Sequence, residues 1–178
     1  VQFVNSDELI DKIRMTKSPV EIKQMRKLWD LSKRAMERFL DVLEPGKTGW
    51  ELAAEACRVT RAGGASEELV FLNESGVQGT PKNIPVKCND VIQYHMEICG
   101  PSGHYSEITV MCAYREPTDL ELKLMDSELE AYDKIMEIAK PGIKISELAQ
   151  TFDKSLIEDG WKFGPPKKHF DFHGQGLD

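Results

Sequence analysis

The sequence lacks the features that mark several large classes of proteins. It contains no run of about 18 apolar residues, so we expect nothing in it to span a membrane. Its first residues, VQFVNSDEL, show neither a basic region nor an apolar core, so we expect no signal peptide. A basic block is also missing and the formal net charge is −7 at pH 7, which argues against nucleic acid because phosphate binding needs clustered cations.

Closely spaced cysteines are missing as well. The four cysteines are Cys57, Cys88, Cys99 and Cys112, and no two form a CxxC pair. This excludes the usual pattern of a zinc ribbon or a redox motif. We therefore expect reduced thiols in a cytoplasmic protein.

The length of 178 residues fits one domain with a real core. The chain starts at Val1 rather than Met and stops within HGQGLD, which is typical of a structured loop. We expect residues 1–178 to form a single catalytic-type domain whose last strands lie beyond Asp178. Residues 1–17 are expected to link it to a preceding domain.

Capping boxes predict where three helices begin, because a hydroxyl residue is followed three positions later by Glu and then by apolar residues at helical spacing. These boxes are Ser18 to Glu21, Thr48 to Glu51, and Thr118 to Glu121. Proline and glycine pairs predict the helix ends, at Pro45-Gly46, Gly63-Gly64 and Pro141-Gly142. A fourth helix is predicted from about Ser146 to Gly160.

Strands are predicted between the second and third helices. Residues 69–72 form the first, and a polar loop follows over residues 73–85. Residues 86–99 and 104–114 alternate in polarity, and the tetrad Gly100-Pro101-Ser102-Gly103 between them predicts a turn, so the two strands form a hairpin.

An internal repeat of 96 residues relates the two parts of the chain. Pro45-Gly46 corresponds to Pro141-Gly142, Glu51 to Glu147, and Gly64 to Gly160. The repeat halves cover about 18–114 and 115–178. Two copies are too few for a solenoid, so the repeat predicts an α/β (α+β) fold of two pseudo-symmetric halves, with helices on one face of a sheet. A ligand cleft is expected between the halves.

The hairpin carries polar residues that folding alone does not require. His95 and Glu97 share one face of a strand because they are two residues apart. A regular four-residue turn places Glu97 opposite Ser106, so we expect a one-residue bulge if Glu97 and Glu107 are to meet. A carboxylate pair of this kind needs a metal ion or a shared proton. The alternative is a solvated face with surface ion pairs.

Two further segments hold candidate residues. His169 and His173 are four apart, among aromatic residues and glycines that let a ligand approach the backbone. Structural histidines are the alternative. The loop of residues 73–81 contains Gln78, which falls beside Gly174 when it is shifted by the 96-residue repeat.

In its motifs the chain resembles the pita-bread metallopeptidase and creatinase family, which includes methionine aminopeptidase, Xaa-Pro aminopeptidase, prolidase and creatinase. Residues 14–22, RMTKSPVEI, resemble the family segment R-x-x-K-S-P-x-E-I. Residues 43–48, LEPGKT, resemble L-x-P-G-x-T, and residues 172–178, FHGQGLD, resemble G-H-G-I-G-L-D. The resemblance implies a curved, mainly antiparallel sheet with helices on its outer face.

The resemblance also implies site residues. Family peptidases hold two metal ions with Asp, Asp, His, Glu and Glu, and an activated water attacks the peptide carbonyl. His173 matches the ligand His, and Glu107 matches the second Asp. The first Asp falls at Met96 or at His95, depending on where the count starts, and Glu97 is the nearest carboxylate. Gln78 stands where the peptidases keep a substrate-side His.

These departures leave three hypotheses. The first is a divergent Xaa-Pro peptidase-like hydrolase or lyase acting on a small amino-acid-like substrate, and its hairpin is similar to that of a sulfonium lyase of this fold. The second is a metal-free, creatinase-like C–N hydrolase. The third is a binding module without catalysis.

The first hypothesis predicts one divalent metal ion, Mn, Co, Zn or Fe, and the second predicts none. The residues for each predicted role are catalytic His95, Glu97 and His173, substrate-binding Gln78, His169 and Tyr105, and metal-binding Glu97, Glu107 and His173. The expected partners are a small molecule or short peptide and, by resemblance, a second copy in a homodimer.

Overall fold

The computed structural model of the chain describes residues 5–74, 76–162 and 174–176. The described residues fall into two compact units. The first unit contains the residues up to Arg115 together with Gln175 and Gly176, and the second contains those from Glu116 to Gly174.

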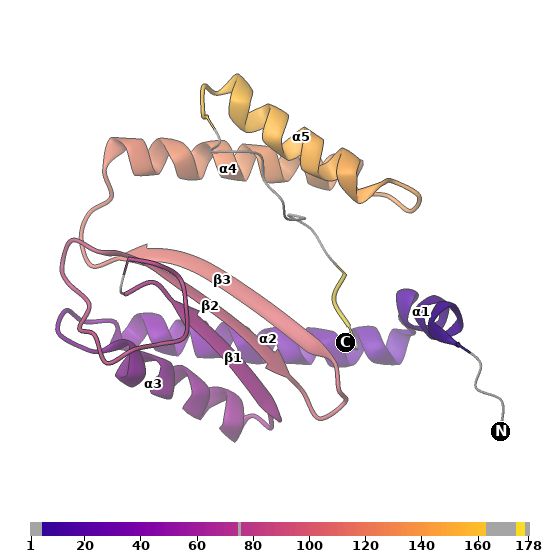
Figure 1. Cartoon of the computed structure of the whole chain (residues 1–178), viewed down its shortest axis with the longest axis horizontal. Helices are drawn as coiled ribbons and strands as arrows, with labels where there is room; N and C mark the ends of the chain where they lie inside the picture. The colour runs from indigo at the N-terminus through magenta and orange to yellow at the C-terminus, as the bar shows by residue number, and fades with distance from the viewer. Residues whose placement is uncertain (1–4, 75, 163–173, 177–178) are drawn as a thin grey trace. The chain divides into compact units, whose positions relative to one another are not determined.

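The first unit is a three-stranded antiparallel sheet with helices on one face. Figure 1 shows α2 running along the strands, with α3 beside it. The strand order is β1-β2-β3. The elements are α1 (Asp7–Met15), α2 (Pro19–Val42), α3 (Gly49–Ala62), β1 (Glu67–Leu72), β2 (Val91–Cys99) and β3 (Tyr105–Ala113).

Side-chain caps start the two long helices of this unit, as predicted. Ser18 and Glu21 form a complete capping box on α2, and Thr48 and Glu51 form one on α3. The short helix α1 was not predicted. It buries none of its residues and begins where the Asp7 N–H donates to the Asn5 side chain, 2.8 Å away.

Two predicted strand boundaries were wrong. β2 begins at Val91 rather than Val86, because Lys87 and Asp90 close a turn in which the Lys87 N–H donates to the Asp90 carboxylate at 2.9 Å. Val86 instead exchanges backbone hydrogen bonds with Gly46 and Lys47. β1 begins two residues before Leu69, at Glu67.

The prediction of a four-residue turn in the hairpin was also wrong. Cys99 pairs with Tyr105, so five residues form the turn, and the Gly100 N–H donates to the His104 carbonyl at 2.9 Å. The register is continuous from Val91–Ala113 to Cys99–Tyr105 and places Glu97 opposite Glu107. The fifth turn residue therefore brings Glu97 and Glu107 to the same face, and no bulge is needed.

Alternation along β2 separates a core face from an open face. Tyr94, Met96 and Ile98 are fully buried against the helices, and the Tyr94 ring lies 4.4 Å from the Phe39 ring, centroid to centroid. Polar groups in this layer are paired as well: the Ser32 hydroxyl donates to the Ser106 hydroxyl at 3.1 Å, and the Tyr94 hydroxyl donates to the Met96 sulfur at 3.0 Å. His95 and Glu97 alternate with these buried residues along β2, so their side chains point to the open face of the sheet.

The second unit repeats the helix pair of the first. The elements are α4 (Asp119–Ile138) and α5 (Ile145–Glu158), which end 96 residues after α2 and α3 respectively. Helices α3 and α5 are both 14 residues long. The turn glycines agree as well, with φ of 95° at both Gly46 and Gly142. The helices of the two pairs therefore end at positions related by the 96-residue repeat.

None of the helices in the described ranges is both long enough and apolar enough to cross a membrane.

Candidate functional site

The open face of the hairpin brings two carboxylates directly together. The Tyr105 N–H donates outward to the Gly176 carbonyl at 2.8 Å, and the Cys99 carbonyl accepts from the N–H of Ser66, just before β1, so this pair exchanges no hydrogen bonds across the hairpin. Hydrogen-bonded and non-hydrogen-bonded pairs alternate along an antiparallel ladder. Glu97 and Glu107 lie two positions from Cys99 and Tyr105, so they also form a non-hydrogen-bonded pair. Such pairs have the closest side chains.

The imidazole of His95 lies between these carboxylates. Its Nε2 is 3.1 Å from Oε1 of Glu97, and its Nδ1 is 3.5 Å from Oε1 of Glu107. Nδ1 also lies 2.8 Å from the hydroxyl of Thr109, the residue opposite His95 on β3. The ring is 13% exposed, so its orientation is fixed by packing and by these polar contacts.

The three residues are chemically suited to hold a divalent cation. One ligand atom from each of His95, Glu97 and Glu107 lies within 4.8 Å of the others. Ligands bound at about 2.0–2.2 Å around a tetrahedral ion are separated by roughly 3.5 Å, so only small side-chain rotations are needed. An imidazole nitrogen with two carboxylates is also a donor set that suits Zn, Mn, Co or Fe.

Gln78, a predicted substrate-binding residue, lies beside His95. Phe71, Gln78, Gly79 and His95 line a small hollow of about 280 Å³. The loop returns to the sheet because Leu72 and Gly79 exchange backbone hydrogen bonds of 2.9 and 2.8 Å.

Asn73 fixes the base of the same loop. Its side chain donates to the Val91 carbonyl at 3.0 Å and accepts from the Gln93 N–H at 2.7 Å. The buried carboxylate of Glu74 accepts from the Lys82 N–H. These residues are scaffold, and they position Gln78.

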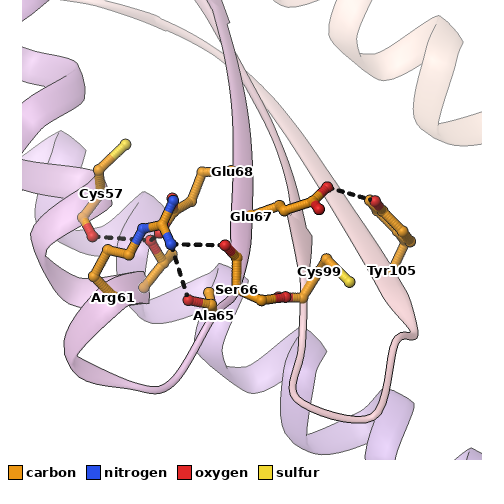
Figure 2. Close-up of polar contacts among 9 residues, drawn as sticks. Cys57, Arg61, Ala65, Ser66, Glu67, Glu68, Cys99 and Tyr105 are labelled. Atoms are coloured by element: carbon orange, nitrogen blue, oxygen red, sulfur yellow. Dashed lines mark hydrogen bonds and ion pairs between the residues drawn. The ribbon is translucent and has the colours of Figure 1, made fainter.

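Tyr105 borders the cluster, but its hydroxyl is held toward β1 by Glu67. Figure 2 shows its hydroxyl directed at Glu67, with a donor–acceptor distance of 2.9 Å. This hydrogen bond, followed by partial desolvation, raises the pKa of Tyr105 to about 12, so the phenol is protonated at neutral pH. Tyr105 can therefore donate or shape a pocket, and it is not a base.

The neighbouring Glu68 has a structural role. Its side chain is buried and accepts from the Thr60 hydroxyl at 2.7 Å, and it forms an ion pair with Arg61 (Figure 2). Arg61 also donates to the Ser66 carbonyl at 2.7 Å. A buried carboxylate with these partners fixes the α3–β1 connection.

A larger cleft, with a volume of about 800 Å³, opens on the other side of Glu107. Its walls come from α2 and β3, and Gln175 closes part of it by donating to the Glu107 carboxylate at 3.2 Å. The residues around it are Lys17, Ile22, Met25, Arg26, Trp29, Tyr105, Ser106, Glu107, Thr109 and Gln175.

The structure thus groups four of the predicted residues, His95, Glu97, Glu107 and Gln78, and places Tyr105 at the border. His169 and His173 lie outside the described residues. The sequence did not indicate Arg26 or Trp29, and only the R-x-x-K-S-P motif drew attention to Lys17. Nothing local in the sequence showed that this part of α2 would face β3.

The fold and the hairpin define the class: this is an α/β domain of the pita-bread type, with helices on one face of an antiparallel sheet and an acidic cluster on the other. Residues 23–178 match the model of metallopeptidase family M24, and the chain belongs to that family.

Similar proteins agree with this assignment. A Xaa-Pro dipeptidase of Pyrococcus horikoshii is 27% identical over 185 residues, which covers 99% of this chain and 51% of the relative. A putative dipeptidase of Bacillus subtilis, YkvY, is 25% identical over 182 residues, with 99% and 49% covered. The chain spans about half the length of the curated relatives it matches.

Solved structures show the same fold. The prolidase from Pyrococcus horikoshii OT3 has a TM-score of 0.85 at 24% identity, covering 97% of this chain and 50% of that one. The X-Pro aminopeptidase from Thermotoga maritima MSB8 has a TM-score of 0.83 at 23% identity, covering 99% and 51%. The predicted pita-bread fold is therefore confirmed.

Proposed function

We propose that this chain carries part of the active site of a Xaa-Pro dipeptidase-like hydrolase that acts on a small amino-acid-like or dipeptide-like substrate with one divalent metal ion. The observation that carries the proposal is the convergence of His95, Glu97 and Glu107 on the open face of the hairpin. In a metallopeptidase family, this is the part of the fold where such a donor set has a chemical purpose.

The proposed ligands are His95, Glu97 and Glu107, and His173 stays a prediction. When bound, a divalent ion polarises a carbonyl and lowers the pKa of water. Glu97 and Glu107 supply the negative charge that such an ion needs, and it would relieve their mutual repulsion.

The surrounding residues orient this cluster. Thr109 fixes the His95 ring through Nδ1, which leaves Nε2 directed at Glu97. A hydrogen bond from the other ring nitrogen sets the tautomer and the orientation of a metal-binding imidazole. Gln78 can hydrogen-bond a substrate carbonyl from the hollow beside His95, although it cannot transfer a proton as the His of the family peptidases does.

Metal content tests the proposal. The purified protein is expected to retain about one equivalent of a divalent metal by elemental analysis, and Glu107→Ala is expected to lower its metal affinity about 10- to 100-fold or more. Glu67→Gln is the matched control, because Glu67 lies on the same face outside the cluster. A protein that takes up no metal, or loses it equally in both variants, contradicts the proposal.

A second candidate function has its own supporting observation. Nε2 of His95 lies 3.1 Å from the Glu97 carboxylate and Nδ1 lies 2.8 Å from the Thr109 hydroxyl, so the ring can pass a proton between these two groups. This arrangement favours a metal-free, creatinase-like C–N hydrolase in which His95 transfers a proton. Turnover of guanidino or N-acyl compounds that survives chelation and is lost in His95→Gln supports this candidate, and turnover abolished by chelation rejects it.

A further inference from the structure

A buried histidine holds the turn of the β2–β3 hairpin against the beginning of α2. His104 is the last of the five turn residues, and its exposed fraction is 5%. Its carbonyl accepts from the Gly100 N–H at 2.9 Å, which closes the turn. Figure 1 shows this turn beside the first part of α2, and a Cβ atom at Gly100 would approach the Leu28 side chain to 3.0 Å. The His104 ring is therefore enclosed between the turn and the helix.

The two nitrogens of the His104 ring face different partners. Nδ1 lies 3.0 Å from the hydroxyl of Ser102, in the same turn. Nε2 lies 3.7 Å from Oε1 of Glu21, the residue that completes the capping box of α2. Nε2 is buried and makes no hydrogen bond to a residue in the described ranges, so the nearby carboxylate is what offsets the cost of burying it.

The carboxylate of Glu21 is fixed in its charged form. Its second oxygen, Oε2, accepts from the Ser18 N–H at 2.7 Å, and the Glu21 N–H donates to the Ser18 hydroxyl at 3.3 Å. The hydrogen bonds with Ser18, and after them the nearby His104, keep the pKa of Glu21 below its ordinary value, so this group is ionised at neutral pH. A carboxylate that faces Nε2 favours a proton on that nitrogen, which directs an N–H at Glu21.

The same turn decides where Glu107 points, because its five residues place Glu107 opposite Glu97 on the open face. His104 comes three residues before Glu107 and lies on the helix side of the hairpin, as the buried Ser106 does. Ser106 is anchored to Ser32 of α2 by their hydrogen bond of 3.1 Å. Contacts with α2 therefore hold this end of β3 at two points, and the carboxylate of Glu107 projects from the other side.

We propose that His104 is a positioning residue for the cluster: its contact with Glu21 holds the hairpin turn on α2 and thereby keeps Glu107 in place to bind a metal ion. This inference rests on the proposed function for the role of Glu107 as a ligand, whereas the contact itself needs no metal. Without the contact the turn is free to move, so Glu107 must be ordered when the ion binds, and the affinity for the ion falls.

Metal affinity measures this positioning, with Zn²⁺ alone as the probe and isothermal titration calorimetry of the purified protein as the method. His104→Leu is expected to weaken Zn²⁺ binding about tenfold, the lower end of the effect of residues that orient metal ligands. His104→Gln keeps a donor near the position of Nε2 and is expected to restore the affinity to within about twofold of the wild type. His104→Asn reaches only Ser102, so it is expected to bind Zn²⁺ as weakly as His104→Leu.

Glu21→Gln tests the partner, and Glu51→Gln is the matched control. Both residues complete a capping box, on α2 and on α3, but of the two only Glu21 faces His104. Glu21→Gln is expected to weaken Zn²⁺ binding about three- to tenfold because the amide carries no charge, and Glu51→Gln is expected to leave it unchanged. The double variant His104→Leu/Glu21→Gln should bind Zn²⁺ like His104→Leu alone, because both changes remove one contact.

Amide hydrogen exchange of the metal-free protein is an independent measurement. Ser106 and Ile108 occupy hydrogen-bonded positions of the β2–β3 ladder, one and three positions from the non-hydrogen-bonded pair beside the turn. Their amides are expected to exchange about tenfold faster in His104→Leu and in Glu21→Gln, and at the wild-type rate in Glu51→Gln. Circular dichroism and the thermal midpoint establish that each variant is folded.

Equal Zn²⁺ affinity of the wild type and His104→Leu overturns the proposal, and so does an equal loss in Glu21→Gln and Glu51→Gln. A His104→Gln variant that binds as weakly as His104→Leu also overturns it, because the contact with Glu21 would then not be the cause. If the wild-type protein takes up no Zn²⁺, the metal proposal fails and the exchange rates decide this one: faster exchange in His104→Leu and Glu21→Gln supports it, and unchanged exchange overturns it.

Discussion

The α2–α3 pair and the α4–α5 pair are built alike but buried differently. Their turn glycines have nearly the same φ, 92° at Gly64 and 91° at Gly160. Equivalent positions are buried in both pairs, as in Ala35 and Ala131, or Phe39 and Ile135. Yet only the first pair packs on a sheet within the described residues.

This difference separates local from tertiary causes. Caps and glycine turns depend on a few neighbouring residues, so the helices of the two pairs end at equivalent positions, and α3 and α5 have the same length, although α2 is four residues longer (24 against 20) than α4. Burial depends on what covers a helix face. At one equivalent position, Met136 in the second pair is 56% exposed, while Leu40 in the first pair is 37% exposed.

The largest test of this comparison removes an equivalent core residue from each pair. Phe39→Ala is expected to lower the free energy of unfolding by about 3–5 kcal/mol, because the Phe39 ring packs on Tyr94 within the sheet–helix core. Ile135→Ala is expected to lower it by only about 2 kcal/mol, the lower end for such a truncation.

Urea denaturation with hydrogen exchange measures the loss in each unit. Equal losses would mean that α4 is as well packed as α2 and would remove the distinction drawn above.

A smaller effect is expected at the turns. Gly46→Ala and Gly142→Ala place a Cβ in open space but force it into the left-handed region. Each is expected to cost about 1–2 kcal/mol from conformation alone. Thermal unfolding should give the same value at both sites, and a clear inequality would show that the turns are not locally determined.

The smallest effect concerns the helix caps. Thr48 caps α3, but the equivalent residue of α5 is Lys144, which makes no side-chain cap although Glu147 stands three residues later. Lys144→Thr is expected to add about 0.5–1 kcal/mol by completing a capping box, and Thr48→Ala should remove about as much. Chemical denaturation measures both; a destabilised Lys144→Thr variant would show that the lysine has another role.

Much of this architecture was predictable from the sequence because its signals are local. The three capping boxes and the proline–glycine stops located the four main helices. The start of β2 was missed because Val86 continues the alternating pattern, while its partner, Lys47, comes from a distant turn. Helix α1 was missed because none of its residues is buried against the rest of the unit, so no packed apolar face marks it in the sequence.

The candidate site was predictable only in part. Spacing and family resemblance identified His95, Glu97 and Glu107, because two residues along a strand share a face. Whether Glu107 faces the same side as His95 and Glu97 depends on the number of residues in the turn, and the alternation of polar and apolar residues does not give that number. The cleft cations were missed because Arg26 and Glu107 are distant in sequence and only packing brings α2 against β3.

The hairpin register has a consequence for how the chain avoids misfolding. If β3 slipped by one residue along β2, Glu107 would turn toward α2 and Ser32 would lose its hydrogen bond to Ser106. A carboxylate buried without a partner is far less stable than one in water, so the slipped hairpin is strongly disfavoured. Glu107 therefore has two roles: it forms the site, and its charge disfavours a one-residue slip of the hairpin in either direction.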